Sequence, residues 1–208
     1  MAQHGNRQLA RLQEDWSFET LATHYNGQRL NGPNEVVFKA NGDMYFTDPF
    51  YGLEKQDEDP SKELSFAGIY YVRQGTNKVI LLEAELSGPN GLAFSPDESK
   101  LYVANTGEQQ SPAIWAYDVE ADGSISHKRL LYDFSHIEGP GGPDGLKVDG
   151  KGNVWATGPG GVYVIDEDGI VLGTIKTGQI VSNVAFGGSD GKTLFMTSDM
   201  FLYSLPLL

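Results

Sequence analysis

The chain has 208 residues, enough for one domain with a sizeable hydrophobic core. Its 15 basic and 28 acidic residues give a formal net charge of −13. This charge argues against nucleic acids and anionic membranes as partners, because their phosphates need a basic surface. No apolar run is long enough to span a membrane, and the absence of cysteine excludes disulfides and thiol catalysis. With no signal-peptide pattern and no cysteine, the compartment stays open and the cytoplasm is favoured.

Short segments rich in β-branched and aromatic residues follow one another along the chain, which predicts an all-β fold. Residues 1–27 contain two such segments, 7–12 and 17–22, which resemble the outer strands of an incomplete unit. Three four-stranded units and a last unit that lacks its outer strand follow, over residues 28–86, 87–136, 137–178 and 179–208. The predicted strands of these four units are 35–39, 43–47, 68–72, 79–82, 92–95, 100–104, 114–118, 128–132, 146–149, 153–157, 162–166, 170–175, 184–186, 193–197 and 201–205.

One insertion, residues 54–63, separates the second and third strands of the first complete unit. Its density of charged residues excludes burial, so we expect a surface loop. A solvated loop is the simpler interpretation. The alternative is a lid, because the preceding segment 48–52 leads into it from the inner part of the unit.

A recurring phrase stands at the start of the first strand of successive units, and its copies are Gly32–Phe38, Gly88–Phe94 and Gly142–Val148. The third residue of each copy is Asn34, Asn90 or Asp144, and the steps between them are 56 and 54 residues. A weaker fourth copy holds Asn183, 39 residues further on. Repeats near this period are typical of β-propeller blades, whose inner strands line a central channel. We therefore expect these side chains to converge at one end of the channel.

The predicted fold is one β-propeller domain of the six-bladed kind, incomplete at about four to five blades. We count about 17 strands, whereas a closed six-bladed ring has about 24. The first blade and the inner half of the second are expected to be missing. An open arc leaves two sheet edges unpaired, so a homo-oligomer that covers them is one expectation.

Asn34, Asn90 and Asp144 offer two amides and one carboxylate, and oxygen donors of this kind suit hard divalent cations. The four histidines are scattered, which gives no pattern for a zinc site. Taken singly, Pro-Asn-Gly and Pro-Asp-Gly are ordinary turn sequences, so only their common register favours a functional role. Arg29 and Asn31 precede the first copy and either face a polar substrate or bridge neighbouring blades.

Several motifs together resemble the gluconolactonase/regucalcin/luciferin-regenerating-enzyme family along essentially the whole chain. They lie at residues 4–7, 29–35, 46–52, 88–97, 143–146 and 183–188. The resemblance implies a six-bladed propeller that hydrolyses lactones, typically sugar lactones of carbohydrate metabolism, with a divalent ion at the channel mouth. It also implies that Asn90 and Asp144 are metal ligands, that Asp144 is the general base, and that Asn34 contacts substrate or ion.

The resemblance is incomplete at the N-terminal side. Members of the family begin with a blade that carries a further metal ligand, a glutamate in a Glu-Gly-Pro motif. The chain has Glu138-Gly139-Pro140, but this copy lies just before Asp144 and does not correspond to that glutamate by order. The chain is therefore expected to represent an N-terminally truncated member of the family.

The sequence thus predicts a metal-dependent hydrolase that opens a small sugar-type lactone. Ca²⁺ is the favoured ion, with Mg²⁺, Mn²⁺ and Zn²⁺ as alternatives, and the expected partner is a small-molecule lactone. Asn34, Asn90 and Asp144 are the predicted metal ligands, and Asn34, Arg29 and Asn31 the predicted substrate contacts. Two other functions stay open: a non-catalytic propeller fragment that acts as a binding or assembly module, and a propeller hydrolase acting on phosphoesters or aryl esters.

Overall fold

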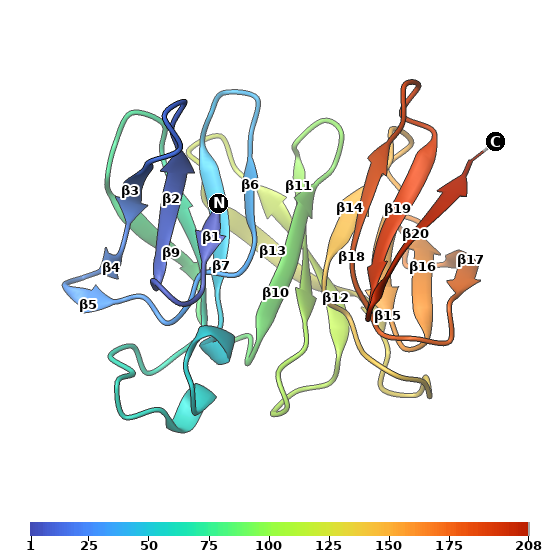
Figure 1. Cartoon of the computed structure of the whole chain (residues 1–208), viewed down its shortest axis with the longest axis horizontal. Coiled ribbons are helices and arrows are strands. Elements are labelled where there is room, and N and C mark those ends of the chain that lie inside the picture. Colours follow the sequence, from blue (N-terminus) through green and yellow to red (C-terminus); the bar gives the residue numbers. More distant parts are fainter. Residues whose placement is uncertain (208) are drawn as a thin grey trace.

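The computed structural model describes residues 1–207, and its regular structure is β-strand apart from two short 3₁₀ turns, η1 (Phe50–Gly52) and η2 (Gln56–Glu58). The strands form five small sheets that follow one another in an arc, with a two-stranded hairpin beside the first (Figure 1). This arrangement is an incomplete β-propeller with five blades, and it confirms the predicted all-β propeller fold. Within residues 1–207, no helix is long and apolar enough to cross a membrane.

In chain order, the five sheets have three, four, four, four and three strands, and within each sheet consecutive strands pair antiparallel. The bounds are β1 (Ala2–Gln3), β2 (Gln8–Leu12) and β3 (Phe18–Ala22); β6 (Val36–Phe38), β7 (Met44–Asp48), β8 (Gly68–Val72) and β9 (Val79–Glu83); β10 (Pro89–Phe94), β11 (Lys100–Asn105), β12 (Ala113–Val119) and β13 (Ile125–Asp133); β14 (Leu146–Val148), β15 (Val154–Gly158), β16 (Gly161–Ile165) and β17 (Val171–Lys176); β18 (Val181–Gly187), β19 (Thr193–Ser198) and β20 (Phe201–Pro206). The separate hairpin is β4 (His24–Tyr25) with β5 (Gln28–Arg29).

The first sheet differs from the sequence-based expectation. Two strands were expected there, but β1 adds a third by pairing with β2, with Ala2 opposite Leu9. With β1 and the β4–β5 hairpin, the described residues hold 20 strands, so the count of about 17 was low. Each of these extra strands has only two residues, too short for the apolar alternation that marks a strand in a sequence.

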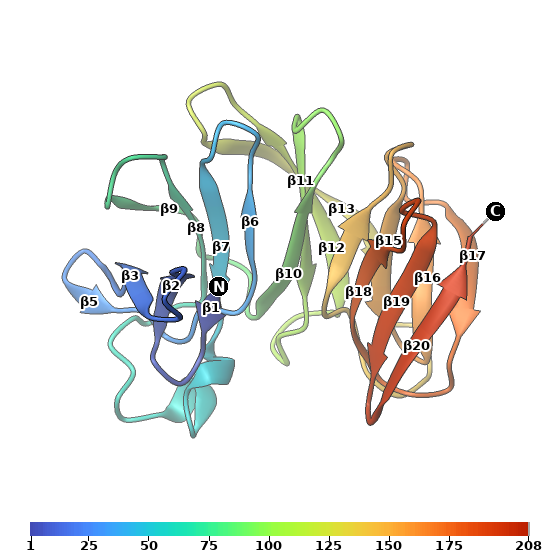
Figure 2. The ribbon, with the colours of Figure 1, turned by 45° about the horizontal axis from the view of Figure 1, so that its top comes forward.

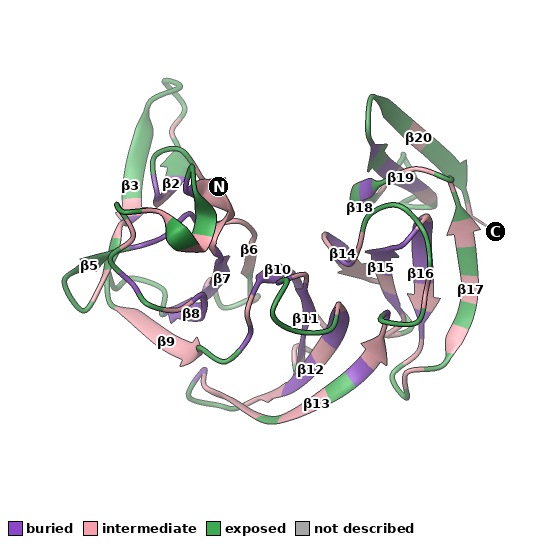
Figure 3. Cartoon of the chain, turned by 90° about the horizontal axis from the view of Figure 1, so that it is seen from below, coloured by how far each residue is buried: buried purple, intermediate pink, exposed green. Residues whose placement is uncertain are grey.

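The blades stand side by side around the middle of the arc, as the turned view shows (Figure 2). Seen from below, β6, β10, β14 and β18 lie nearest the middle, and outer strands such as β17 and β20 are more exposed (Figure 3). Because each blade begins with its inner strand, equivalent positions of β6, β10 and β14 face the same central region.

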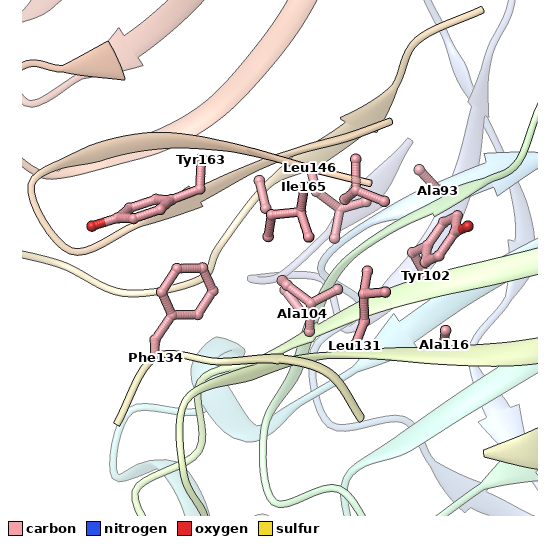
Figure 4. Close-up of a cluster of buried hydrophobic side chains, with 12 residues drawn as sticks. Ala93, Tyr102, Ala104, Ala116, Leu131, Phe134, Leu146, Tyr163 and Ile165 are labelled. Atoms are coloured by element: carbon pink, nitrogen blue, oxygen red, sulfur yellow. The ribbon is translucent and has the colours of Figure 1, made fainter. Parts of the chain in front are cut away.

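Neighbouring blades are held together by apolar side chains that interlock between their sheets. Between the third and fourth blades, Tyr102 and Leu131 of one sheet pack against Leu146 and Ile165 of the other (Figure 4). In the same cluster, the ring centroids of Phe134 and Tyr163 lie 5.0 Å apart, edge to face. Burial of a large aliphatic or aromatic side chain contributes about 1.5–3 kcal/mol, so this layer is a main source of stability.

Backbone hydrogen bonds also join the starts of successive inner strands. The N–H of Gly91 donates to the carbonyl of Asp144 at 3.0 Å, and the N–H of Gly145 donates to the carbonyl of Ser182 at 2.8 Å. A Cβ on Gly91 would lie 2.3 Å from the Asp144 carbonyl oxygen, closer than any real contact. Glycine therefore follows the asparagine or aspartate in these two copies because the next blade occupies the space of a side chain, with the Asp144 backbone at Gly91 and mainly the Asn183 side chain at Gly145.

We expect Gly91→Ala to lower the free energy of unfolding by about 1–3 kcal/mol, the usual effect of overpacking. The added methyl group would have to displace the backbone of the next blade. Gly173→Ala in β17 is the control, because a Cβ there meets nothing within 4 Å. Urea unfolding followed by circular dichroism would measure both variants, and equal stabilities would contradict the close approach.

A buried carboxylate fixes the turn before the first inner strand. Asp48, at the end of β7 and fully buried, accepts hydrogen bonds from the backbone N–H of Asn31 at 2.8 Å and of Gly32 at 2.7 Å. Asn105, at the end of β11, holds the corresponding turn of the next blade, because its side-chain oxygen accepts a hydrogen bond from the backbone N–H of Gly88 at 2.9 Å. Burial raises the pKa of Asp48 to about 7, although the two N–H donors and the nearby Arg7 oppose this rise.

This raised pKa predicts a pH dependence of stability. The Asp48 carboxyl has an ordinary pKa of 3.8 when unfolded and about 7 when folded, so between these values only the folded state keeps the proton. The contribution of Asp48 to the free energy of unfolding should therefore be complete below pH 3.8 and fall as the pH rises to about 7.

Urea unfolding of the wild type and Asp48→Asn across this pH range would isolate the contribution. In the variant, the free energy of unfolding should no longer fall with pH in the way that Asp48 causes. The variant should also be less stable at low pH, because its NH₂ group faces a backbone N–H. If the free energies of unfolding of the two proteins changed with pH in parallel, Asp48 would carry the same charge in the folded and the unfolded state.

Candidate functional site

Asn34, Asn90 and Asp144 come together at the starts of β6, β10 and β14. The Asn34 side-chain amide donates to the Asn90 side-chain oxygen at 3.0 Å. Asn90 also hydrogen-bonds the Asp144 carboxylate, which makes it the middle member of the group. Asn90 is 6% exposed, so its side chain lies within the protein rather than on an open turn.

The second strands of the blades hold this group in place. The Thr47 hydroxyl, at the end of β7, donates to the carbonyl of Asn90 at 2.7 Å. The Thr157 hydroxyl, at the corresponding position of β15, accepts from the backbone N–H of Asp144 at 2.7 Å. Thr106 accepts from the Asn90 amide at 3.4 Å and donates to the carbonyl of Pro143. Thr47 and Thr157 thus fix the backbone of Asn90 and Asp144, and Thr106 also holds the Asn90 side chain.

The Asp144 carboxyl is the acidic group of the cluster, and its surroundings favour the protonated form. Its pKa is raised to about 6, mainly by burial; the hydrogen bond from Asn90 opposes this rise, and the negative charge of Glu35 adds to it. A partly buried carboxyl with a raised pKa beside polar side chains is a common feature of functional sites.

A second polar group joins three blades next to the first. The Asn183 amide of β18 donates to the Glu35 carboxylate at 3.2 Å, and the Lys147 ammonium of β14 lies 3.7 Å from the same carboxylate. The sequence-based reasoning named Asn183 as a weaker fourth copy but missed Glu35 and Lys147. A signal was present, because Glu35 occupies the position where the other two copies have glycine, Gly91 or Gly145.

Arg29 and Asn31 lie apart from this group. Asn31 is fully buried, and its amide donates to the carbonyls of Asp48 at 3.3 Å and Phe66 at 3.0 Å. Arg29 is exposed, and its guanidinium donates to the carbonyl of Asn6 at 3.2 Å. Both partners of Asn31 lie in its own unit, residues 28–86, so these contacts do not bridge two blades, and substrate binding by either residue stays a prediction.

The donor chemistry of the first group fits a hard divalent cation. Its amide and carboxylate oxygens are ligands that Ca²⁺ and Mg²⁺ accept. In the described part of the chain, no three His, Cys, Asp or Glu side chains are grouped as a metal site, and Asp144 is the carboxylate among the three candidate ligands. A set with one charge leaves room for further oxygen ligands, such as water or a substrate carbonyl.

Comparisons with known proteins identify related sequences. Residues 1–200 match the family model described as SMP-30/gluconolactonase/LRE-like region. A gluconolactonase from Zymomonas mobilis is 42% identical over 184 residues, which cover 86% of this chain and 51% of the relative. A 6-deoxy-6-sulfogluconolactonase from Pseudomonas putida is 37% identical over 112 residues, 52% of this chain and 37% of the relative.

The solved structures show the same likeness. A gluconolactonase from Xanthomonas campestris superposes with a TM-score of 0.87 and 36% identity, over 100% of this chain and 67% of that one. The chain spans about half the length of the Zymomonas relative, so it corresponds to part of such a protein. The family model, the sequence relatives and the propeller fold together show that the chain belongs to the SMP-30/gluconolactonase/LRE-like family.

Proposed function

We propose that the chain carries out the hydrolysis of a small sugar-type lactone at the group formed by Asn34, Asn90 and Asp144. The observation that carries this proposal is the convergence of two amides and one partly buried carboxyl from three successive blades. The relatives named gluconolactonase support the reaction class. Because the chain spans about half the length of the curated relative, the activity of the whole protein is part of the proposal.

In this proposal, Asn34, Asn90 and Asp144 hold a divalent cation, with Ca²⁺ favoured. A bound cation would supply Lewis-acid polarisation of the lactone carbonyl and make a nearby water more acidic. Asn90 is well suited to a fixed position in the set, because its side chain and its carbonyl are each held by hydrogen bonds. Asn34 lies at the edge of the group, where it is placed to contact the substrate as well.

Asp144 is the proposed general base. Its carboxylate takes a proton from water as the water oxygen forms a bond to the lactone carbonyl carbon. The bond between that carbon and the ring oxygen then breaks, and the proton returns to the ring oxygen. One water and one lactone give one hydroxy acid, so no other reactant is consumed.

Replacing Asp144 should have the largest effect on the reaction. Asp144→Asn keeps the shape of the side chain but removes the base, so we expect the rate to fall by about 10²–10⁴-fold. Ring opening of glucono-δ-lactone, followed by the acid it releases, would measure this. Asp168→Asn, in the exposed β16–β17 turn, is the control and should keep the wild-type rate. An Asp144→Asn variant as fast as the wild type would remove Asp144 from the reaction.

Binding of a cation can be tested without any substrate. Titration calorimetry with Ca²⁺ should give a clear binding signal for the wild type and a weaker or absent one for Asp144→Ala, which removes the charged ligand. Asn90→Ala should also weaken binding, and Asp168→Ala should not. Equal affinities in the wild type and Asp144→Ala would place the binding site elsewhere.

A further inference from the structure

The segment between β7 and β8 lies beside the proposed reaction site. It contains η1 and η2 and extends below the strands at the end where β10 begins (Figure 1). A Cβ on Gly32 would lie 2.6 Å from the Cα of Gly52, so the segment packs directly on the turn that carries Asn34. The side chain of Leu53 is buried, which anchors the segment to the protein.

A cleft separates this segment from the loop that follows β11. It has a volume of about 270 Å³, and its walls include Tyr51, Asp57, Thr106, Glu108 and Gln109. The Gln109 amide donates to the Asp57 carboxylate at 3.1 Å, so a hydrogen bond joins the two sides. A second cleft of about 240 Å³ shares Asp57 and Gln109 with the first.

Tyr51 and Thr106 connect the cleft to the reaction site. The Tyr51 hydroxyl donates to the carbonyl of Gly88 at 3.2 Å and also contacts Thr106. Thr106 in turn accepts from the Asn90 amide. The charge of Asp144 is close enough to contribute to the raised pKa of Tyr51, which burial raises to about 12. The cleft therefore borders the reaction site through these two residues, within reach of a ligand bound at Asn90 and Asp144.

The charges around the cleft are negative. Asp57 and Glu108 line the first part and Glu85 the second, and no Lys, Arg or His of the described residues lines either part. Lys62 does reach Asp57, at 3.8 Å, but its ammonium also lies over the Phe50 ring at 4.7 Å and is not part of either lining. Carboxylates and amides suit the hydroxyl groups of a polyol, whereas an anionic substituent would be repelled.

We propose that this cleft binds the hydroxylated part of a neutral sugar lactone and that its carboxylates, Asp57 and Glu108, select against lactones with a negatively charged substituent. This inference rests on the proposed function and specifies the substrate class for the same site. It separates the chain from its relative named 6-deoxy-6-sulfogluconolactonase, whose name denotes a sulfonated substrate.

The kinetic test compares kcat/KM for glucono-δ-lactone with kcat/KM for its 6-phosphate ester, which adds a charge far from the ring carbonyl. The wild type should prefer the neutral lactone by at least about tenfold. In the double variant Asp57→Asn/Glu108→Gln, this preference should shrink by about threefold for each charge removed. Asp57→Asn keeps an oxygen that accepts from Gln109, so the segment should stay in place.

Glu167→Gln is the matched control, because Glu167 is an exposed carboxylate that lines neither cleft. The ratio of kcat/KM for the two lactones should be the same in this variant as in the wild type, and this result would exclude a general effect of net charge. Equal rates for the two lactones in the wild type, or an unchanged ratio in the double variant, would overturn the inference and leave the proposed function standing.

A binding measurement tests the cleft separately from lactone hydrolysis. The probe is 1,5-anhydro-D-glucitol, a neutral polyol without an ester, titrated into the ¹⁵N-labelled protein. The amide signals of residues 50–57 and 106–109 should shift, and Gln109→Met should weaken the binding at least threefold by removing an amide that hydrogen-bonds hydroxyl groups. Shifts elsewhere, or none, would overturn the inference, whereas failure to hydrolyse any lactone would overturn only the proposed function.

Discussion

The structure depends on the backbone hydrogen bonds that join the starts of neighbouring inner strands. Gly91 donates to the carbonyl of Asp144, and Gly145 donates to the carbonyl of Ser182. Each bond holds the first turn of one blade at the same level as the first turn of the next. Because Asn90 and Asp144 occupy these turns, their side chains cannot be moved apart without separating the blades. The site is thus a direct consequence of blade packing.

This dependence also explains why the polar side chains tolerate burial. A buried amide or carboxyl is costly unless it has hydrogen-bond partners. The Asn90 amide finds partners in Asn34 and Thr106, and the Asp144 carboxyl finds one in Asn90. Most of these partners lie in a neighbouring blade or in the adjacent strand. The same contacts that satisfy the polar groups therefore also fix their orientation toward one another.

The repeated phrase made the convergence of Asn34, Asn90 and Asp144 predictable from sequence, because strand alternation and repeat period are local properties. The contact between Glu35 and Asn183 was not, since it joins residues 148 positions apart and depends on how the blades curve around the arc. The two-residue strands carry no recognisable pattern. Nor does a local pattern reveal that Asn31 is fully buried, because that burial comes from the segment that packs over it.

The negative charge of the protein acts at this site in two ways. Near Asn90, the single carboxylate of Asp144 would provide the charge that the proposed divalent cation needs, and the amides around it would add oxygen ligands without further repulsion. In the neighbouring cleft, which Asp57 and Glu108 line, these carboxylates would face the outer part of the proposed substrate.

Lactone hydrolysis converts a neutral ring into a hydroxy acid that ionises at neutral pH. The carboxylates that accept a neutral polyol would therefore repel the product carboxylate, and since this repulsion is absent from the substrate, it acts only after ring opening. On the proposed function, Asp57 and Glu108 would oppose the attraction between the bound cation and the product carboxylate and so favour release of the product.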